Sequence, residues 1–524
     1  MSVHPNPLSR RRAMGMAAAG GAALSLPLLG GCSDDDTGEA ATPRDDAPAR
    51  PRRGGTLTAA LAGGGPAESL DPFSAASPAD FARNRVIYDV LFWSAHDQVQ
   101  PGLALSATTA PGGTSFTLKL RKGVVWHDGS PFGAKDVAFT LRYVTSPDRT
   151  YPSELSGYID PAGIEAEDDH TLVVPLSRPI GDPAGLLAAN QIFVLKDGTK
   201  AFEPGKVMGT GPLKVTDFAP GRSSTLRRFD DHWDGAPYLD ELVVLSLNDP
   251  QARVNAVRSG QADFAAALPY TEAAKGRGAG PTVVHKGTRN ERTGFGFMLS
   301  TGRPPFDDPR VRKAVRLAVD RQSLVDTVLL GYGEVGNDLY GAGAQYYADD
   351  LEPLARDVDQ ARSLLRAAGA EGVQITVRSA EIETGCNASA ELFAEQMKDI
   401  GLKVKAQTVS AAEFFDVKAM ESVDAVTFAI YGFPLQAIYT RTALRPSLAF
   451  DDPQFKRSLA DAIAVRGADE RQQAWRRVQT AMHDRGNWVV WGFADTLSLA
   501  RDRVRGVTGR GTAKYPYLGK AWLA

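Results

Sequence analysis

The sequence predicts an α/β protein built from more than one domain. Residues 116–120 alternate apolar and polar side chains, as half-buried strands do, and Asp128-Gly129 then turns the chain into an apolar helical run that opens at Ala134. Residues 373–404 have the pattern strand, helix, strand, with Gly401 ending the helix. Because strands joined through a helix run parallel, this second segment predicts a parallel sheet in a separate lobe.

Length and composition fit a large globular protein with an ordinary charge balance. The chain has 524 residues, of which 43% are hydrophobic and 23% are charged, and this size predicts two or three domains. The formal net charge is -3, and no long run of Lys or Arg occurs. The sequence therefore gives no electrostatic indication of nucleic-acid binding, and we expect none.

The first 31 residues are typical of an export signal. Arg10, Arg11 and Arg12 form a basic region, and the stretch 15–29 that follows is apolar, rich in Gly and Ala, and too short and weak to remain a membrane-spanning helix. Consecutive arginines indicate twin-arginine (Tat) export. They also occur in ordinary Sec signals, so both routes remain open.

A lipid anchor is predicted directly after this signal. Leu29-Gly30-Gly31-Cys32 has the pattern of a bacterial lipobox, in which the Cys32 thiol accepts a diacylglycerol; the alternative for Cys32 is a free surface thiol. Residues 32–53 are polar and almost without large apolar side chains, so they cannot bury enough surface to fold. We expect an exported protein, held at the outer face of the cell membrane or in the periplasm by a lipid on Cys32 and a disordered tether.

The second cysteine, Cys386, predicts no intrachain disulfide. The sequence has two cysteines, and acylation of Cys32 would leave Cys386 without a partner. Cys386 could be a nucleophile, but no catalytic motif surrounds it. We therefore expect a small, packed thiol.

Eight motifs follow one another along the chain. Gly54–Leu61 predicts the first strand of the folded part, while Leu70–Pro72 and Val86–Phe92, taken alone, are explained as a turn and as a packed helix end. Gly211 and Gly235 in later motifs permit backbone positions that a Cβ atom would strain. The motifs are Gly54–Leu61 (GGTLTAAL), Leu70–Pro72 (LDP), Val86–Phe92 (VIYDVLF), Phe116–Leu141 (FTLKLRKGVVWHDGSPFGAKDVAFTL), Met208–Leu213 (MGTGPL), Asp231–Asp240 (DHWDGAPYLD), Arg253–Asp263 (RVNAVRSGQAD) and Phe306–Asp320 (FDDPRVRKAVRLAVD). In residue type, spacing and order they resemble the signature segments of the family 5 extracellular solute-binding proteins, the dipeptide, oligopeptide and nickel receptors of ABC importers.

The resemblance implies a fold and a division into domains. The fold is α/β and periplasmic-binding-protein-like: two-lobed, of type II, in the large cluster with an extra insert domain, with a cleft between the lobes. On this basis the parts are lobe I at 54–83, 205–283 and 489–524, its insert domain at 84–204, and lobe II at 284–488. The crossovers near 284 and 488 would be the hinges of closure.

The motif at 306–320 predicts a helix with a polar face. Asp308 is the cap, Pro309 lies in the first turn, and apolar residues recur at helical spacing. We expect the polar face, with its three arginines and Lys313, to be solvated rather than to bind an anionic ligand.

The sequence has no enzyme motif with the spacing and the structural context that its chemistry requires. Residues 331–336 match GxGxxG but follow a helical run, where a dinucleotide fingerprint must follow a strand, so we expect a loop there. Walker A, HExxH and GxSxG sequences are absent, and none of the seven histidines lies within five residues of another. We expect no enzyme activity, no catalytic residue, no cofactor and no metal; a hydrolase site assembled from distant residues is the alternative.

The strand before Tyr431 bears on the ligand. In peptide-binding relatives an Asp typically follows this strand and pairs with the ligand's α-ammonium group. Here Asp424 precedes the strand and no Asp follows it. The usual partner of a free peptide N-terminus is therefore missing after this strand, which leaves recognition of that group open, and the surroundings suit a neutral, anionic or N-blocked ligand.

The candidate ligand-binding residues come from this strand and from segments that relatives place in the cleft. Backbone groups of the strand would bind an extended ligand in a strand-like mode. The same aromatic side chains could instead pack in the core. The candidates are Ala429, Ile430, Tyr431, Gly432, Phe433, Gln436, Tyr439, Arg441, Trp491 and Tyr340.

Together these features predict a monomeric, lipid-anchored binding protein of an ABC importer. It would capture a small solute, a peptide or peptide-like molecule, and close around it before docking on permease subunits in the membrane. Receptors for nickel chelates or other non-peptide solutes, and a sensory or surface binding module without a transporter, are the alternatives.

Overall fold

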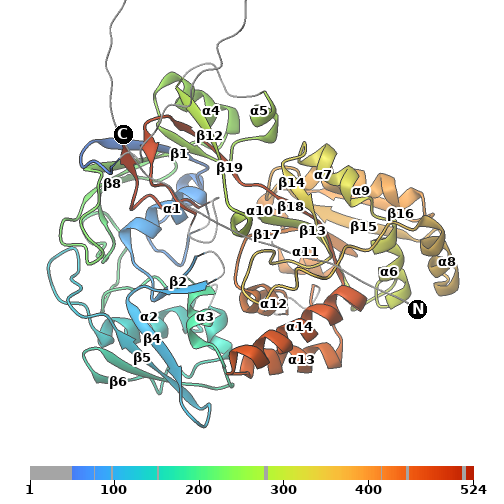
Figure 1. Cartoon of the computed structure of the whole chain (residues 1–524), viewed down its shortest axis with the longest axis horizontal. Helices are drawn as coiled ribbons and strands as arrows, with labels where there is room; N and C mark the ends of the chain where they lie inside the picture. The colour runs from blue at the N-terminus through green and yellow to red at the C-terminus, as the bar shows by residue number, and fades with distance from the viewer. Residues whose placement is uncertain are drawn as a thin grey trace, which may run out of the picture. The chain divides into compact units, whose positions relative to one another are not determined.

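The computed structural model describes residues 50–524 except 76, 96–97, 150–152, 190, 276–280, 415, 444–447 and 510–514. The predicted signal, Cys32 and the tether up to residue 49 lie outside the described residues. Within them, three sheets each carry a hydrophobic core (Figure 1).

A seven-stranded sheet has β1 near its centre. Its order is β12-β19-β11-β1-β10-β9-β8, and β1 runs parallel to β10 and β11. The strands are β1 (Thr56–Leu61), β8 (Leu213–Ala219), β9 (Ser223–Arg228), β10 (Glu241–Ser246), β11 (Phe264–Ala266), β12 (Thr282–Lys286) and β19 (Leu497–Arg501). Nearby lie η1 (Gly65–Ala67), α1 (Pro78–Ile87), α4 (Pro250–Ser259), α5 (Tyr270–Ala274) and the pair β20 (Val504–Arg505) and β21 (Trp522–Leu523). The strand predicted at 54–61 is confirmed.

A four-stranded sheet, β4-β5-β7-β6, lies within the predicted insert segment 84–204. Its elements are β4 (Ala104–Thr109), β5 (Ser115–Leu120), β6 (Glu165–Asp168), β7 (Thr171–Pro175), α2 (Ala134–Thr145), η2 (Glu154–Gly157), α3 (Pro183–Ala189) and the hairpin strands β2 (Phe92–Ala95) and β3 (Gln98–Pro101). The predicted strand at 116–120 and the helix from Ala134 are confirmed. Asp136 caps α2, because its carboxylate accepts from the backbone N–H of Gly133 at 2.8 Å.

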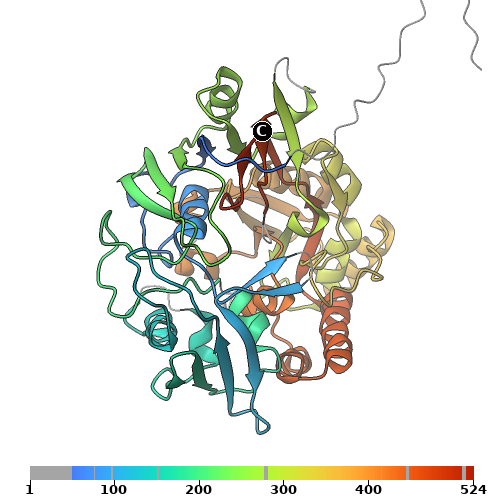
Figure 2. The same ribbon diagram turned by 60° about the vertical axis from the view of Figure 1, so that its left-hand side comes forward.

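A six-stranded sheet, β14-β18-β13-β17-β15-β16, is covered by helices on both faces (Figures 1 and 2). The strands are β13 (Thr293–Leu299), β14 (Gly333–Val335), β15 (Gln374–Ser379), β16 (Lys403–Thr408), β17 (Ala425–Ile430) and β18 (Trp488–Ala494). The helices are η3 (Arg289–Glu291), α6 (Pro309–Ala318), α7 (Arg321–Val328), α8 (Val358–Ala368), α9 (Cys386–Lys398), α10 (Ala411–Phe414), α11 (Val417–Glu421), α12 (Leu435–Ala443), α13 (Pro453–Ala464) and α14 (Ala468–Arg485). The predicted parallel unit is confirmed, since β15 and β16 pair in parallel on either side of α9 in the chain. Cys386 is buried in this core, as expected.

Two expectations about this region are corrected. Residues 331–336 are not wholly a loop, because Gly333–Val335 forms the short strand β14 against β18. The polar face of α6 is not wholly solvated: Arg312 and Arg316 are buried and donate to backbone carbonyls at the C-terminal end of α14. Those carbonyls lack partners within their helix and carry the negative end of its dipole, so the two guanidinium groups act as a cap.

The motifs that looked like separate turns meet at Asp89. Its carboxylate accepts from the hydroxyl of Thr210 at 3.1 Å and from the indole N–H of Trp233 at 2.8 Å, and it lies 3.4 Å from the ring of His232. Gly209 and Gly211 flank Thr210 and press against α1, where a Cβ on either would lie within 2.7 Å of a backbone oxygen. Side chains from three motifs thereby fix the segment that leaves α1.

His127 belongs to the same cluster. Its Nε2 lies 3.0 Å from the carbonyl of Gly211, and the ring packs edge-on against Phe229 at 5.1 Å. Loss of water around this buried ring lowers the pKa of His127 to about 4. The imidazole is therefore neutral at physiological pH.

The chain passes twice between the seven- and six-stranded sheets, and Asp495 joins the two crossovers. The first crossover is residues 287–292 and the second is 495–496. The carboxylate of Asp495 lies 2.7 Å from Nε of Arg292 in the first crossover and 2.5 Å from Nζ of Lys286. The predicted boundary at 284 falls within β12, and β18 belongs to the six-stranded sheet; the division into two lobes at those positions stays a prediction.

Replacing Asp495 by Asn should destabilise the protein by about 2 to 3 kcal/mol, because it removes the buried carboxylate that Arg292 and Lys286 share and leaves Arg292 with Glu334 alone. The measurement is the midpoint of urea unfolding. The matched control is Glu395→Gln, which breaks an exposed pair with Lys398 and should cost at most about 0.5 kcal/mol. Equal effects of the two substitutions would show that the crossovers do not depend on Asp495.

His127 should make stability depend on pH. An unfolded histidine titrates near pH 6.5, whereas the folded ring resists protonation down to about pH 4. The unfolded chain therefore binds the extra proton, and stability should fall by up to about 3 kcal/mol as the pH drops through this window. Urea unfolding of the wild type and His127→Gln between pH 7.5 and 4.5 tests this. The variant should lose part of the slope; parallel curves would contradict the assignment.

Candidate functional site

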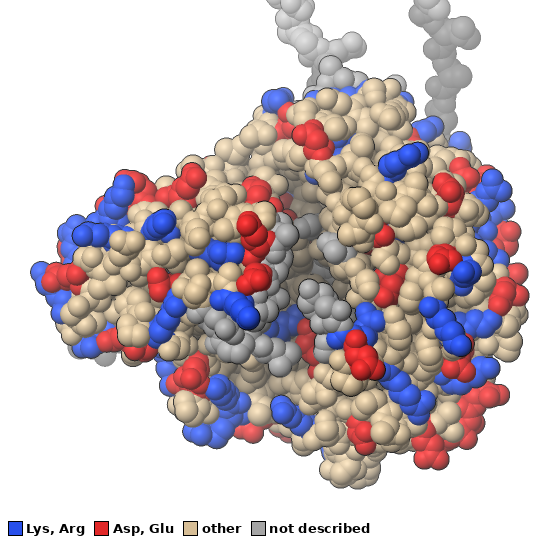
Figure 3. Space-filling view, turned by 180° about the vertical axis from the view of Figure 1, so that it is seen from behind, with Lys and Arg blue, Asp and Glu red and all other residues tan. Residues whose placement is uncertain are grey.

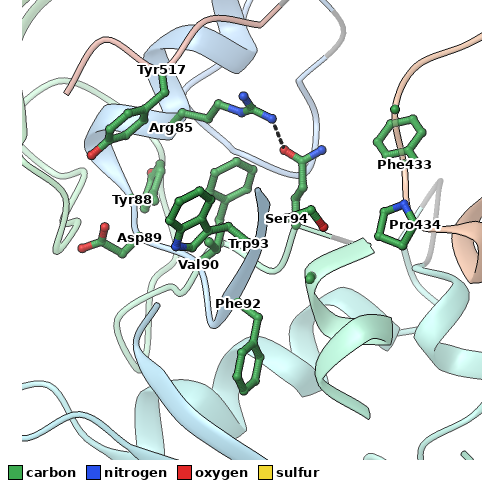
Figure 4. Close-up of a pocket in the computed structure, with 14 residues that line it drawn as sticks. Arg85, Tyr88, Asp89, Val90, Phe92, Trp93, Ser94, Phe433, Pro434 and Tyr517 are labelled. Atoms are coloured by element: carbon green, nitrogen blue, oxygen red, sulfur yellow. Dashed lines mark hydrogen bonds between the residues drawn. The ribbon is translucent and has the colours of Figure 1, made fainter. Parts of the chain in front are cut away.

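Segments far apart in the sequence line a small cavity of about 50 Å³. One wall comes from the end of α1 and from β2, including Arg85, Trp93 and Ser94. Phe433 and Pro434, between β17 and α12, form another part of the lining (Figure 4). Tyr517 near the C-terminus completes it. The cavity therefore depends on the arrangement of all these segments rather than on any single motif.

Two further cavities adjoin this one through shared lining residues. A cavity of about 40 Å³ shares Ser94, Phe433 and Pro434 with it. A larger cavity, of about 540 Å³, shares Trp93 and Tyr517. This volume lies within the usual range for a small-molecule site, whereas the two small cavities hold only a few atoms. We call the three together the cleft cavities.

Charged groups beside the small cavity are held by the protein itself. Arg85 donates to the side chain of Gln191 at 3.0 Å, the bond drawn in Figure 4, and to the carbonyls of Gly509 and Tyr515 at 2.8 and 2.6 Å. Asp89, which also lines the cavity, is bound by the motif cluster described above. The guanidinium of Arg85 thereby fixes the C-terminal segment against α1.

The strand predicted to bind ligand ends at these cavities. Gly432 and Phe433 line both small cavities. Ala429 and Ile430 are the last residues of β17, paired with Phe295 and Gly294 of β13. Tyr431 follows them, and its hydroxyl donates to the carboxylate of Glu383.

Arg441, one of the predicted ligand-binding residues, is bound by groups of the protein itself. Its Nε lies 3.0 Å from the carboxylate of Glu154 in η2, and Nη2 donates to the carbonyl of Ala189 at 3.2 Å. The guanidinium also lies over the ring of Phe433, at 4.6 Å from its centroid. In this structure Arg441 therefore bridges α12 to the region of the four-stranded sheet and supports the cavity wall.

The other four candidates are buried in the core around the six-stranded sheet. Trp491 is 0% exposed and packs on the side of α6 to α9, next to Phe295. Tyr340 and Tyr439 pack on the opposite face, against Trp488. Gln436 lines a cavity of about 30 Å³ beneath α12.

Several residues that line the cleft cavities were not predicted from the sequence. Arg85, Trp93, Asn290 and Tyr517 line the cleft cavities. The motif VIYDVLF ends one residue before Trp93, but that motif was interpreted as a helix end. No periodicity marks Asn290 or Tyr517, because what brings them to the site is the pairing of distant strands.

Within the described part of the chain, no group of three or more His, Cys, Asp or Glu side chains could hold a metal ion. Among the same residues, no helix is long and apolar enough to cross a membrane. The face seen from behind is hollowed near its middle, and Lys and Arg alternate with Asp and Glu over the rest of it (Figure 3). That face presents no large surface of one charge sign.

Comparison with known proteins shows the family. A model of the family described as "Bacterial extracellular solute-binding proteins, family 5 Middle" matches residues 98–446. The chain is 26% identical over 362 residues to the glutathione-binding protein GsiB of Salmonella choleraesuis (strain SC-B67), a match that covers 66% of this chain and 68% of that protein.

Solved structures show the fold. The periplasmic binding protein DppA from Helicobacter pylori, in complex with peptide STSA, matches with a TM-score of 0.75 at 21% identity, over 90% of this chain and 98% of that one. AgaA from A.tumefacien R10, in complex with agropinic acid, matches with a TM-score of 0.75 at 23% identity, over 90% and 99%. The predicted two-lobed, periplasmic-binding-protein-like α/β fold is confirmed. The chain belongs to the bacterial extracellular solute-binding proteins of family 5, which are binding proteins and not enzymes.

Proposed function

We propose that this protein is the lipid-anchored, extracytoplasmic receptor of an ABC importer and that it binds a peptide or peptide-like solute in the cleft cavities. The observation that carries the proposal is the cavity of about 540 Å³, which the first crossover lines and which shares Trp93 and Tyr517 with the small cavity at the end of β17. Two relatives support the ligand class: GsiB is named for glutathione, a tripeptide, and DppA was solved with a tetrapeptide and is described as ABC transporter-associated.

The end of β17 offers an extended ligand a place to bind. Gly432 and Phe433 follow the end of β17 and line the two small cavities, where the glycine leaves the main chain uncovered by a side chain. An extended peptide could pair with this backbone, and such binding is insensitive to side-chain identity. Trp93 and Phe433 supply apolar surface for the ligand's side chains.

Closure around the solute would rest on weak contacts remote from the crossovers. Arg441 and Glu154 keep 34% and 23% of their side chains exposed. Arg471 of α14 donates to the carbonyl of Gly181 at 2.9 Å, and the N–H of Gly181 donates to the carbonyl of Ile463 at 2.7 Å. Partly exposed bonds of this kind contribute about 1 kcal/mol or less each, so a solute held from both sides can shift the population toward the closed state. The closed receptor would then dock, as a monomer, on permease subunits in the membrane.

Mass spectrometry of the solute retained by the natively purified protein tests the receptor function. We expect a peptide or peptide-like molecule, which should rebind in calorimetric titration once the protein has been unfolded and refolded. Recovery of a metal chelate or a sugar would overturn the assigned ligand class. If nothing is recovered and no peptide pool raises the melting temperature, the receptor assignment fails.

The lipid anchor depends on Cys32 in our proposal, since the sequence Leu29-Gly30-Gly31-Cys32 has the lipobox pattern. Cys32→Ser should move the protein from the membrane fraction to the soluble fraction and abolish the mass increase of a diacylglycerol. Cys386→Ser is the matched control, because that thiol is buried in the core. It should leave the protein in the membrane fraction; release by Cys386→Ser, or retention of Cys32→Ser, would contradict the anchor.

A further inference from the structure

The largest of the cleft cavities has a floor formed by three adjacent strands. Phe264 of β11 and Ala500 of β19 are directly opposite each other, as are Ser498 of β19 and His285 of β12. Directly opposed residues point to the same face of a sheet, and all four line the cavity. The floor thus passes from an aromatic ring at one end to an imidazole at the other.

The opposite wall comes from the C-terminal segment. Arg505 ends β20, where it pairs with Trp522 of β21. Gly506 follows with φ +72°, and a Cβ there would lie 2.3 Å from the carbonyl of Lys520. The strand pair and this glycine therefore fix the backbone that presents Arg505 to the cavity.

The charged side chains that line this cavity are mostly cationic. They are Lys286, Arg505 and Lys520, with His285 beside them and Glu291 as the carboxylate. Glu291 already accepts from the backbone N–H of Thr288 at 2.8 Å. Loss of water, and next the charge of Arg505, lowers the pKa of His285, so these two side chains lie close together.

The three permanent cations differ in how far the protein neutralises them. Lys286 pairs with Asp495 at 2.5 Å, and Lys520 pairs with Asp234 at 2.9 Å. Within the described ranges, Arg505 has no carboxylate partner; its Nη1 donates to the carbonyl of Asp502 and, at 2.9 Å, to that of Val504. Arg505 is exposed and lines the cavity, and its planar guanidinium has the donor geometry that matches a carboxylate.

A ligand ammonium group finds no comparable partner. The carboxylates on the described lining of the cleft cavities are Asp89 and Glu291. Asp89 is held by Trp233 and Thr210, and Glu291 caps the turn at Thr288. The charge balance of the cleft cavities therefore favours an anionic group over a cationic one.

We propose that the cavity of about 540 Å³ is a subsite for a carboxylate of the transported solute and that Arg505 recognises it. The inference rests on the receptor function proposed above and names the ligand class: solutes with an anionic end, taken in preference to their neutral counterparts. Ser498, Thr288 and Asn290 supply further polar groups around that end, and the rings of Trp93 and Tyr517 cover the remainder.

The test compares the affinity of the whole purified protein for peptide acids with its affinity for the corresponding amides. The probes are glutathione and its C-terminal glycine amide, and trialanine and trialanine amide, titrated calorimetrically at pH 7.5. We expect at least one acid to bind about tenfold more tightly than its amide. Arg505→Gln should reduce this ratio to about one, and Arg505→Lys, which keeps the charge, should retain a severalfold preference.

Arg457→Gln is the matched control, since Arg457 is exposed on α13 and does not line the cavity. It should leave the acid-to-amide ratio unchanged, and urea unfolding should confirm that all variants fold. Equal binding of acid and amide by the wild type would overturn the carboxylate subsite while leaving the peptide receptor intact. An unchanged ratio in Arg505→Gln would remove Arg505 from the subsite. If none of the four probes binds, the carboxylate subsite for peptide acids is overturned, whereas the receptor function is decided by the recovery of the solute described above.

Discussion

The two-lobed architecture depends on one buried carboxylate at the point where the chain passes between its sheets. Asp495 lies in the second crossover and binds Arg292 of the first, while its backbone N–H donates to Tyr332 and its carbonyl accepts from the hydroxyl of Tyr270. A charge that is 2% exposed requires such partners, because an unpaired one would be strongly destabilising. The crossovers are therefore held side by side, while each of the two sheets has its own hydrophobic core.

This constraint also positions the cleft cavities. The first crossover carries Asn290 and Glu291, which line the largest of the three cleft cavities, and Lys286 links that lining to Asp495 itself. On the far side, the Asp89 cluster fixes the segment that carries Trp93. In the closure that we propose, the contacts between α12 to α14 and the region of the four-stranded sheet are the ones that change. A solute-binding protein requires this combination of fixed walls and weak closure contacts.

The sequence predicted the local elements far better than the site. Alternation and capping residues identify β1, β5, α2, α6 and the β15–α9–β16 unit, because these signals depend on neighbours in the chain. Trp93 and Tyr517 are missed, since only pairing between distant strands brings them to one cavity. Tyr340, Tyr439 and Trp491 illustrate the same difficulty: an aromatic side chain has the same sequence signature in a core as in a binding wall. The burial of Arg316 could not be predicted from the sequence either, because its acceptors lie at the distant C-terminal end of α14.

The most direct measurement of the central claim is a crystal structure of the whole chain with its recovered solute bound. We predict electron density for the solute between Trp93 and Phe433, with its anionic end beside Arg505 and the crossovers still joined through Asp495. Density elsewhere would contradict the account. One such place is the groove between Pro304 and Gln374, which is lined by elements around the six-stranded sheet alone.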